Sequence, residues 1–505
     1  MNAIYMKNIT KKFGETIANN QIDFEVKEGE IHCLLGENGA GKTTLMKILF
    51  GLFEKDEGNI FIRDKEVDIN GPREAIDLGI GMIHQHFMLV NRLSVMENII
   101  AGFEPTRNHF IDYKKARKDV EILSQKYQMK VNPEAKIENI SVGEQQRVEI
   151  LKALYRKAEI LILDEPTAVL TPQEIEQLFS VMNTLRENNE TIIFITHKLK
   201  ETLAISDRIT VLRDGKKINT VETESTNSTE LAELMVGREV VLDIEKPPRE
   251  NRKNIFRIKD MELYNPENNL SLKNINFSIE EGEILGVAGV EGNGQLELEE
   301  GIMGLKELDR GHVFLRNREI TNLSIREKRN NGIAYIPSDR LKRGIVEGFT
   351  LEKNLILGSQ WNSEFSNKGV LNKKNIEQYS KKIIEKYDIK TSGTGALASS
   401  LSGGNQQKLV LGREFSKNPE IIIASQPTRG VDIGAKEFIH NVLLEMREKN
   451  KGILLISTEL DELLNLSDRL IVLYEGEIVA RGITEDFQEK ELGLLMAGEK
   501  SGEMV

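Results

Sequence analysis

A glycine-rich segment near the start of the chain has the residue types and spacing of a phosphate-binding loop. Residues 36–43, GENGAGKT, fit the pattern GxxxxGK[ST] between an apolar run at 31–35 and a stretch of helical spacing at 45–53. Its glycines let backbone N–H groups surround phosphate oxygens, while a lysine adds positive charge and a threonine hydroxyl can bind Mg²⁺. The contacts expected from this segment are Gly36, Glu37, Asn38, Gly39, Ala40, Gly41, Lys42, Thr43 and Thr44.

A second candidate element is an apolar run that ends in two carboxylates. Residues 161–167 read LILDEPT, so Asp164 and Glu165 follow a strand-like sequence. Asp164 can hold Mg²⁺ through its waters, and Glu165 can orient or deprotonate an attacking water. An acidic pair of this kind is often only a solvated loop or a helix cap, but its position downstream of a phosphate-binding loop favours a catalytic role.

These two segments need a scaffold that brings them to the same edge of a sheet. β-Branched runs such as 191–195 and 209–212 alternate with segments of helical period such as 174–187. This alternation predicts an α/β fold with a mainly parallel sheet flanked by helices. The charged, helix-prone windows 98–139 and 354–400 predict a helical subdomain in each half of the chain.

The whole pattern occurs twice. Residues 30–44 (EIHCLLGENGAGKTT) align with 283–297 (EILGVAGVEGNGQLE), and residues 141–146 (SVGEQQ) align with 402–407 (SGGNQQ). We therefore predict two tandem homologous domains, at 1–238 and 255–505. A short charged linker with two prolines is expected at 239–254.

The two serine-glycine segments carry a family resemblance. Each follows an apolar residue and precedes the strand–acid element, and each resembles the LSGGQ signature of ATP-binding cassette (ABC) ATPases. The resemblance covers almost the whole chain and implies two tandem P-loop NTPase domains with ATP and Mg²⁺ as cofactors. In that family each ATP meets the phosphate loop of one cassette and the signature of the other, where a serine hydroxyl and N–H groups at a helix N-terminus can hold the γ-phosphate.

The resemblance also gives roles to residues outside the phosphate loop. It implies that Phe13 stacks on the base, that Gln85 contacts Mg²⁺ and that His197 acts beside Glu165 in catalysis. From residue type alone, Phe13 could be a core aromatic and Gln85 a surface amide. His197 could be a histidine whose hydrogen bonds are made at a strand end without a catalytic role. The implied nucleotide contacts are Phe13, Gln85, Asp164, Ser402, Gly403 and Gly404, and the implied Mg²⁺ ligands are Thr43, Gln85 and Asp164.

The second copy carries different chemistry at the aligned positions. Its signature, LSGGNQ at 401–406, is intact, whereas the first signature has Val142 in place of a glycine and Glu144 in place of a glutamine. We therefore expect one complete composite site, built from the first phosphate loop and the second signature, and no hydrolysis in the second loop. The replacements are Gln295 for Lys42, Leu296 for Thr43, Ser425 for Asp164, Gln426 for Glu165, Ser338 for Gln85 and Thr458 for His197.

The sequence contains no apolar run of the roughly 20 residues needed to span a bilayer. Two fused cassettes of this kind resemble the energising subunit of bacterial sugar-type ABC importers. The resemblance implies two membrane permease subunits as partners, an extracellular solute-binding lipoprotein that acts indirectly, and a peripheral position on the cytoplasmic face of the cell membrane. Residues 164–174 (DEPTAVLTPQE) and 425–440 (SQPTRGVDIGAKEFIH) most resemble the nucleoside-importer branch. A ribose/galactose-type importer is the alternative.

Composition argues against other classes. The 505 residues include 68 Lys+Arg and 80 Asp+Glu, a net charge of −12, so we expect no nucleic-acid partner. Cys33 is the single cysteine, which excludes an internal disulfide and favours a structural role. The rival class is that of ribosome-associated tandem ATPases. Those proteins resemble a pair of competent sites joined by a long basic linker, and this sequence has neither feature. A DNA-repair ATPase would need coiled-coil or zinc insertions, which the sequence lacks.

Overall fold

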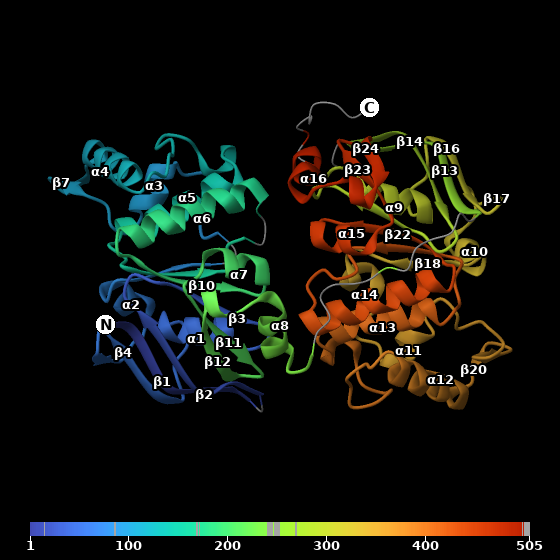
Figure 1. The fold of residues 1–505 in the computed structure, drawn as a ribbon, viewed down its shortest axis with the longest axis horizontal. Helices are drawn as coiled ribbons and strands as arrows, with labels where there is room; N and C mark the ends of the chain where they lie inside the picture. Colours follow the sequence, from blue (N-terminus) through green and yellow to red (C-terminus); the bar gives the residue numbers. More distant parts are fainter. Residues whose placement is uncertain are drawn as a thin grey trace. The chain divides into compact units, whose positions relative to one another are not determined.

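The fold is described from a computed structural model of the chain, drawn in Figure 1. The structure describes residues 1–14, 16–84, 87–167, 170, 172–239, 246, 253–267, 270–496 and 498. The chain forms two compact units, Met1–Val240 and Val241–Val505. Most of the predicted linker lies outside the described residues.

A six-stranded sheet forms the centre of the first unit. Its order is β12-β11-β3-β10-β9-β6, and only β12 pairs antiparallel with its neighbour. Every residue of β3, β9 and β10 is buried, as expected for parallel strands covered on both faces. The strands are β3 (Ile31–Gly36), β6 (Ile80–Ile83), β9 (Ile160–Asp164), β10 (Thr191–Thr196), β11 (Arg208–Arg213) and β12 (Lys216–Glu222).

A second, antiparallel sheet completes the core of this unit, and the sequence reasoning did not predict it. Its order is β2-β1-β4-β5. Phe24 of β2 and Met6 of β1 pack in one apolar cluster with Leu45 and Met46 of α1, so this helix lies between apolar residues of the two sheets. The elements are β1 (Asn2–Phe13), β2 (Thr16–Lys27), β4 (Glu57–Ile62), β5 (Lys65–Val67) and α1 (Lys42–Leu49).

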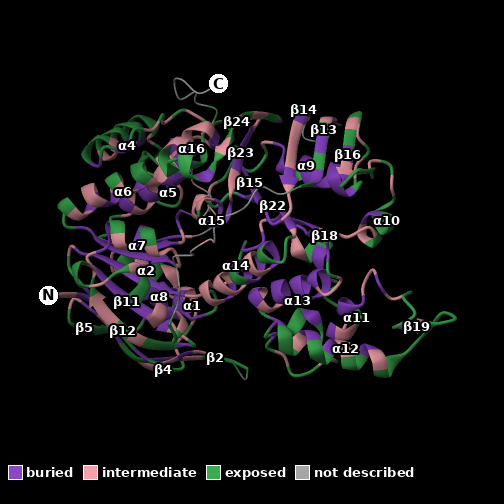
Figure 2. Cartoon of the chain, turned by 45° about the vertical axis from the view of Figure 1, so that its right-hand side comes forward, coloured by how far each residue is buried: buried purple, intermediate pink, exposed green. Residues whose placement is uncertain are grey.

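The predicted helical subdomain of the first unit is present but also contains a small hairpin. Helices α3 and α4 both contact α5, and α4 shows a largely exposed surface (Figure 2). The subdomain consists of α3 (Val95–Ile100), β7 (Thr106–Arg107), β8 (Phe110–Ile111), α4 (Tyr113–Lys126), the 3₁₀ turn Ile137–Asn139 and α5 (Val142–Tyr155). The remaining helices of the unit are α2 (Pro72–Asp77), α6 (Pro172–Glu187), α7 (Leu199–Ile205) and α8 (Ser228–Val236), with a 3₁₀ turn at Thr223–Ser225.

The second unit repeats this architecture. Its six-stranded sheet has the order β18-β21-β22-β15-β23-β24, with only β24 antiparallel, and its four-stranded sheet has the order β14-β13-β16-β17. The six strands are β15 (Ile284–Ala288), β18 (Ile333–Ile336), β21 (Ile421–Ser425), β22 (Gly452–Ser457), β23 (Arg469–Tyr474) and β24 (Glu477–Ile483). The four are β13 (Asn254–Asn265), β14 (Leu270–Glu280), β16 (Arg310–Leu315) and β17 (Arg318–Glu319). These sheets confirm the predicted mainly parallel α/β fold in both copies.

The helices of the second unit follow the same order, with one insertion. A π-helical turn at Arg340–Gly344 lies between β18 and α11. The helices are α9 (Gln295–Met303), α10 (Ile325–Asn330), α11 (Leu351–Leu355), α12 (Lys373–Lys386), α13 (Gly403–Phe415), α14 (Ile433–Glu448), α15 (Leu460–Leu466) and α16 (Glu489–Met496). Short elements are β19 (Ser366–Asn367), β20 (Val370–Leu371) and 3₁₀ turns at Ala398–Ser400 and Thr484–Asp486. Within the described ranges, no helix is both long and apolar enough to cross a membrane.

Candidate functional site

The glycine-rich loop joins the carboxyl end of β3 to the first residue of α1. Lys42, the first residue of that helix, is 5% exposed, and its Nζ donates to the carbonyl oxygens of Gly36 at 2.6 Å and Glu37 at 2.9 Å. The lysine side chain is therefore folded back onto the loop at the N-terminus of α1, where helix N–H groups can bind phosphate. Burial lowers the pKa of Lys42, and the carboxylates of Glu165 and Asp164 oppose that shift.

Gly41 shows why this loop needs glycine. Its φ is 97°, in the left-handed region, and a Cβ atom there would lie 2.3 Å from the carbonyl oxygen of Ala18. The Asn19 side chain also donates to the Gly41 carbonyl at 3.1 Å. β2 therefore fixes the loop from outside, and a side chain at this position would open it.

The acidic pair lies at the carboxyl end of β9, next to the loop. The Thr43 hydroxyl donates to Asp164 Oδ1 at 3.2 Å, which places the two predicted metal ligands side by side. A hydroxyl and a carboxylate are the hard oxygen donors that Mg²⁺ prefers, so this pair fits that ion. Burial raises the pKa of Asp164, an effect that a bound cation would reverse. Gln85, the third predicted ligand, lies outside the described residues.

Glu165 and His197 form a hydrogen-bonded pair. The His197 Nδ1 atom lies 3.0 Å from Glu165 Oε1, and Glu165 is anchored through its own N–H, which donates to Ile195 at 3.0 Å. Glu165 has a φ of 47°, a left-handed conformation that turns the chain sharply after β9. The hydrogen bond to His197 lowers the pKa of Glu165, so its carboxylate stays ionised at neutral pH.

Phe13 ends β1 as an exposed aromatic. Its side chain is 45% exposed, so it is not a core residue, and its ring makes an edge contact with Phe53 at 5.3 Å between centroids. The Lys11 ammonium lies 5.6 Å from the Phe13 ring centroid. An exposed ring of this kind is available to stack on a planar ligand.

The aligned loop of the second unit keeps its shape but not its charges. Gly294 has a φ of 113°, close to that of Gly41, yet Gln295 fills the lysine position and donates to the Val290 carbonyl at 3.0 Å. Glu299, one turn further along α9, is buried and accepts a hydrogen bond from Ser338 at 2.9 Å. Neutral amide and acidic side chains therefore occupy the region that holds a cation in the first unit.

The acidic strand end of the second unit shows the same change. Gln426 has the same φ as Glu165, 47°, and its N–H donates to Ile456 at 2.7 Å. Its side-chain oxygen accepts a weak bond from Thr458 at 3.3 Å. The backbone geometry is retained, but an amide cannot accept a proton from water.

The two signature helices differ in what meets their N-termini. In the first unit the N–H of Gly143 donates to the Glu174 carboxylate at 3.2 Å, and a Cβ at Gly143 would lie 2.8 Å from the same oxygen. In the second unit Ser402 is the N-cap of α13 and accepts from the Asn405 side chain at 2.9 Å. The first signature thus already binds a carboxylate of its own unit. The sequence places Glu174 in a helical segment and at the end of the importer-like segment 164–174, but it did not predict this contact with the first signature.

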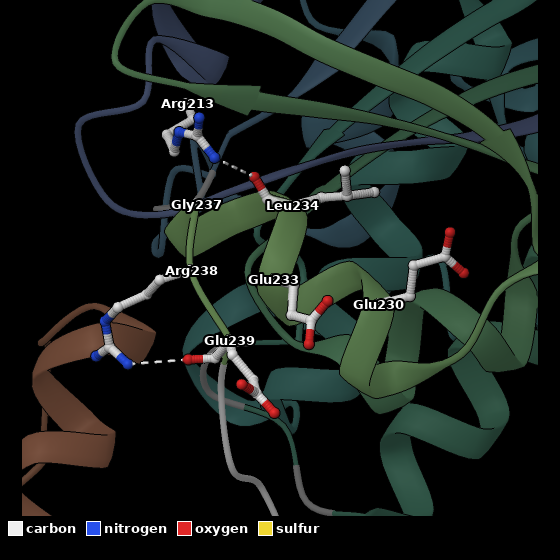
Figure 3. Close-up of a pocket in the computed structure, with 7 residues that line it drawn as sticks. All are labelled: Arg213, Glu230, Glu233, Leu234, Gly237, Arg238 and Glu239. Carbon is white, nitrogen blue, oxygen red and sulfur yellow. Dashed lines mark hydrogen bonds between the residues drawn. The ribbon is translucent and has the colours of Figure 1, made fainter.

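A separate hollow in the first unit, of about 340 Å³, lies at the end of α8 (Figure 3). Arg213 donates to the Leu234 carbonyl there at 2.9 Å and so caps the helix. This hollow contains none of the predicted nucleotide-binding residues. Its lining residues are Arg213, Glu230, Glu233, Leu234, Gly237, Arg238 and Glu239.

Comparison with known proteins identifies the family. The family model described as "ABC transporter" matches residues 19–168 and 272–429. The chain therefore belongs to the ABC transporter family, as its signature segments predicted, and it is of the class of ATP hydrolases coupled to transport.

Several relatives match over nearly the full length of both chains. The nucleoside import ATP-binding protein NupA of Lactococcus lactis is 47% identical over 495 residues, covering 98% of each chain. The guanosine import ATP-binding protein NupO of Bacillus subtilis is 48% identical, covering 98% of this chain and 97% of that one. The ribose import ATP-binding protein RbsA of Geobacillus kaustophilus is 38% identical, covering 94% and 96%.

One solved structure matches across both units. It is the complex of an archaeal ribosomal stalk protein with the archaeal ribosome recycling factor aABCE1, with a TM-score of 0.60, 18% identity and coverage of 93% of this chain and 88% of that one. At this identity the match shows the tandem fold and nothing of function.

Proposed function

We propose that this chain is the ATP-hydrolysing subunit of an importer for nucleosides. One observation carries the assignment of the chemistry: the first unit alone brings a buried lysine, a hydroxyl–carboxylate pair and a hydrogen-bonded Glu–His pair to one sheet edge. The choice of solute class rests on the NupA and NupO relatives. The competent domain corresponds to residues 1–238, and the second domain, at 255–505, supplies its signature.

In this proposal the first unit binds and activates the substrate. The loop N–H groups and Lys42 hold the β- and γ-phosphates of ATP, and Phe13 stacks on the adenine. Thr43 and Asp164 would hold Mg²⁺, which when bound neutralises phosphate charge.

Hydrolysis then needs a base for the attacking water. Glu165 is ionised and anchored, so it can accept the proton of that water, and His197 holds its carboxylate in place through the 3.0 Å bond. Ser402, Gly403 and Gly404 of the second signature complete the site as donors to the γ-phosphate.

The first signature is unsuited to the same task. Glu174 already accepts the Gly143 N–H, so this donor cannot bind a phosphate unless the Glu174 side chain moves away. Together with Gln295 in the second loop, this leaves the opposite composite site without its main phosphate contacts. One ATP-hydrolysing site per chain is therefore the arrangement that the side chains favour.

We place permease docking in the groove beside the predicted Q-loop. A pocket of about 190 Å³ there is lined by apolar residues that include Phe50, Ile76 and Met88. Met88 and Val90 are 64% and 54% exposed, whereas Met96 is 6% exposed and belongs to the buried face of α3. We therefore place Met88 and Val90, and not Met96, on the docking surface.

The proposed partners follow from the importer assignment. They are two permease subunits, which would hold this chain at the cytoplasmic face of the membrane, and a solute-binding lipoprotein outside. A monosaccharide importer remains the alternative through relatives such as RbsA, at 38% identity.

Reconstitution with the permease subunits that co-purify with this chain tests the assignment. ATP-dependent uptake of labelled guanosine or uridine, without uptake of labelled ribose, is the expected result. Lys42→Ala should abolish uptake and ATP hydrolysis, while Gln295→Ala should leave both close to the parent. Uptake of ribose alone would show that the chain belongs to a sugar importer. Equal losses of uptake and hydrolysis from the two substitutions would refute the one-site arrangement.

A further inference from the structure

The segment that contains the π-helical turn at Arg340–Gly344 is longer than the aligned segment of the first unit, part of which lies outside the described residues. Asn98 and Asn354 mark equivalent positions, because the side-chain oxygen of each accepts the N–H of the residue eight positions earlier at 2.8 Å. Ile83 precedes Asn98 by 15 positions, whereas Ile336 precedes Asn354 by 18. π-Turns are energetically unfavourable insertions that concentrate at functional sites. The mechanism proposed above does not use this one.

The Arg340 side chain joins the turn to two other elements. Its Nη1 donates to the Arg429 carbonyl at 2.7 Å and its Nη2 to the Gly430 carbonyl at 3.5 Å. Its Nε donates to the side-chain oxygen of Gln406 at 3.4 Å. Arg429 and Gly430 lie in the loop between β21 and α14, and Gln406 lies in the first turns of α13. One guanidinium therefore links the inserted turn, this loop and the signature helix.

The same guanidinium lies against the signature backbone. A Cβ atom at Gly403 would be 2.6 Å from Arg340 Nη2 and 3.0 Å from the Gly430 carbonyl oxygen. No side chain fits there while Arg340 keeps its position. The aligned residue of the first unit is Val142, whose side chain is 38% exposed. The position of Arg340 therefore explains why residue 403 is a glycine.

The rest of the turn is anchored to the core of the unit. Arg343 forms an ion pair with Glu300 of α9, the helix that follows the second glycine-rich loop. A Cβ atom at Gly344 would lie 3.3 Å from a methyl group of Val410 on α13. Arg340, at one end of the turn, contacts α13 through Gln406, and Arg343, near the other end, contacts α9, which makes the turn a brace between the two helices.

We propose that Arg340 is a positioning residue that fixes the N-terminal turn of α13, so that the second signature is preformed for phosphate. The planar guanidinium presents donors in a rigid fork, which suits two carbonyls and an amide oxygen at once, and a lysine cannot reproduce that pattern. Donors that are already oriented need no rearrangement when charge develops on the phosphate. This inference rests on the proposed function, in which Ser402–Gly404 complete the ATP site.

The test compares variants of the full chain in its permease complex. Arg340→Ala should lower the kcat of ATP hydrolysis at least about tenfold, with the Kd for the fluorescent nucleotide mant-ATP changed by less than about twofold, because the first phosphate loop is intact. Amide hydrogen exchange at residues 402–408 should become faster. Arg340→Lys should restore little of the kcat. Lys342→Ala is the matched control, since that side chain belongs to the same turn and is 83% exposed; it should match the parent.

The outcomes separate this inference from the proposed function. Unchanged exchange at 402–408 in Arg340→Ala overturns the positioning role, whatever the activity shows. Faster exchange with an unchanged kcat shows a brace that does not serve catalysis, and this also overturns the proposal. If Arg340→Ala does not fold, as judged by its thermal transition, Arg340→Gln gives the same comparison. Full hydrolysis by Lys42→Ala would instead refute the proposed function and leave the exchange result standing.

Discussion

A carboxylate introduced at the second signature tests the assignment of the composite site. Gly404→Asp and Gly143→Asp change aligned residues in the two signatures, and both sites are equally crowded. A Cβ at Gly404 would lie 2.8 Å from Asp432 Oδ2, and a Cβ at Gly143 would lie 2.8 Å from Glu174 Oε1. Each substitution therefore costs a similar amount of folding free energy, about 1–3 kcal/mol from overpacking. Each also places a new carboxylate beside an existing one.

The two substitutions should differ in their effect on hydrolysis. If Gly404 approaches the γ-phosphate as the proposed composite site requires, an aspartate at 404 adds a negative charge beside it, and at a separation of about 4 Å and an effective dielectric constant near 20 the repulsion costs about 4 kcal/mol. This corresponds to a loss of roughly 10³-fold in kcat. An aspartate at 143 adds charge where Glu174 already lies and where the opposite loop carries Gln295. We expect its kcat to fall by less than about fivefold, as a consequence of structural strain alone.

Steady-state ATPase measurements on both variants, with thermal unfolding as the control for folding, provide the comparison. The expected result is a similar fall in Tm for both variants and a large fall in kcat for Gly404→Asp only. Equal falls in kcat, or a larger fall for Gly143→Asp, would show that the active site is built within one cassette or between two chains, and the one-site arrangement would have to be abandoned.

Four further predictions concern single side chains of the first unit. Glu165→Gln should bind mant-ATP as the parent does but hydrolyse ATP at least about 100-fold more slowly, since the amide cannot accept a proton; parental turnover would move the base elsewhere. His197→Ala removes the hydrogen bond that lowers the pKa of Glu165, so the pH at which kcat falls on the acid side should rise, and an unchanged pH–rate profile would contradict the pairing. Met96→Ala should lower the free energy of unfolding by about 2–4 kcal/mol, whereas Met88→Ala should keep the parental Tm and reduce transport per ATP hydrolysed; the reverse would place docking on α3. Burial raises the pKa of Cys33 to about 12, so Ellman's reagent should leave the folded protein unmodified and react with one thiol in guanidinium chloride, while rapid reaction in the folded state would refute its burial.

The parallel strands were predictable to within a residue or two, and the antiparallel sheet was not. β9 and β10 are short, wholly buried strands made mostly of apolar residues, which leave a clear signal in sequence. β1 is long, and its pairing with β2 has register shifts between Met6 and Ile9 and again before Phe13. Each shift moves side chains to the other face and breaks the alternation that marks a half-buried strand. The signal of period two is therefore lost although the strand is well paired.

Residues that act through tertiary contacts also could not be predicted from the sequence. Glu174 lies 31 positions after Gly143 and Arg340 lies 63 before Gly403, and neither spacing indicates a contact with the signature. Their effects depend on carbonyl and N–H groups that only the fold brings within 3.5 Å. A hint existed in each case. Val142 stands where Gly403 stands in the other copy, and the segment around Arg340 is longer than its counterpart.

The two units show that loop geometry and loop chemistry are separate constraints on the sequence. Glu165 and Gln426 share a φ of 47°, and Gly41 and Gly294 share a left-handed conformation at the start of their helices. These conformations close the turns between buried strands and helices, so a cassette that loses them would lose its core packing. A lysine or a carboxylate at the same place contributes little to folding, because a buried charge costs free energy that only its ligand offsets. The second unit can therefore exchange these charges for amides and still keep the fold of its loops.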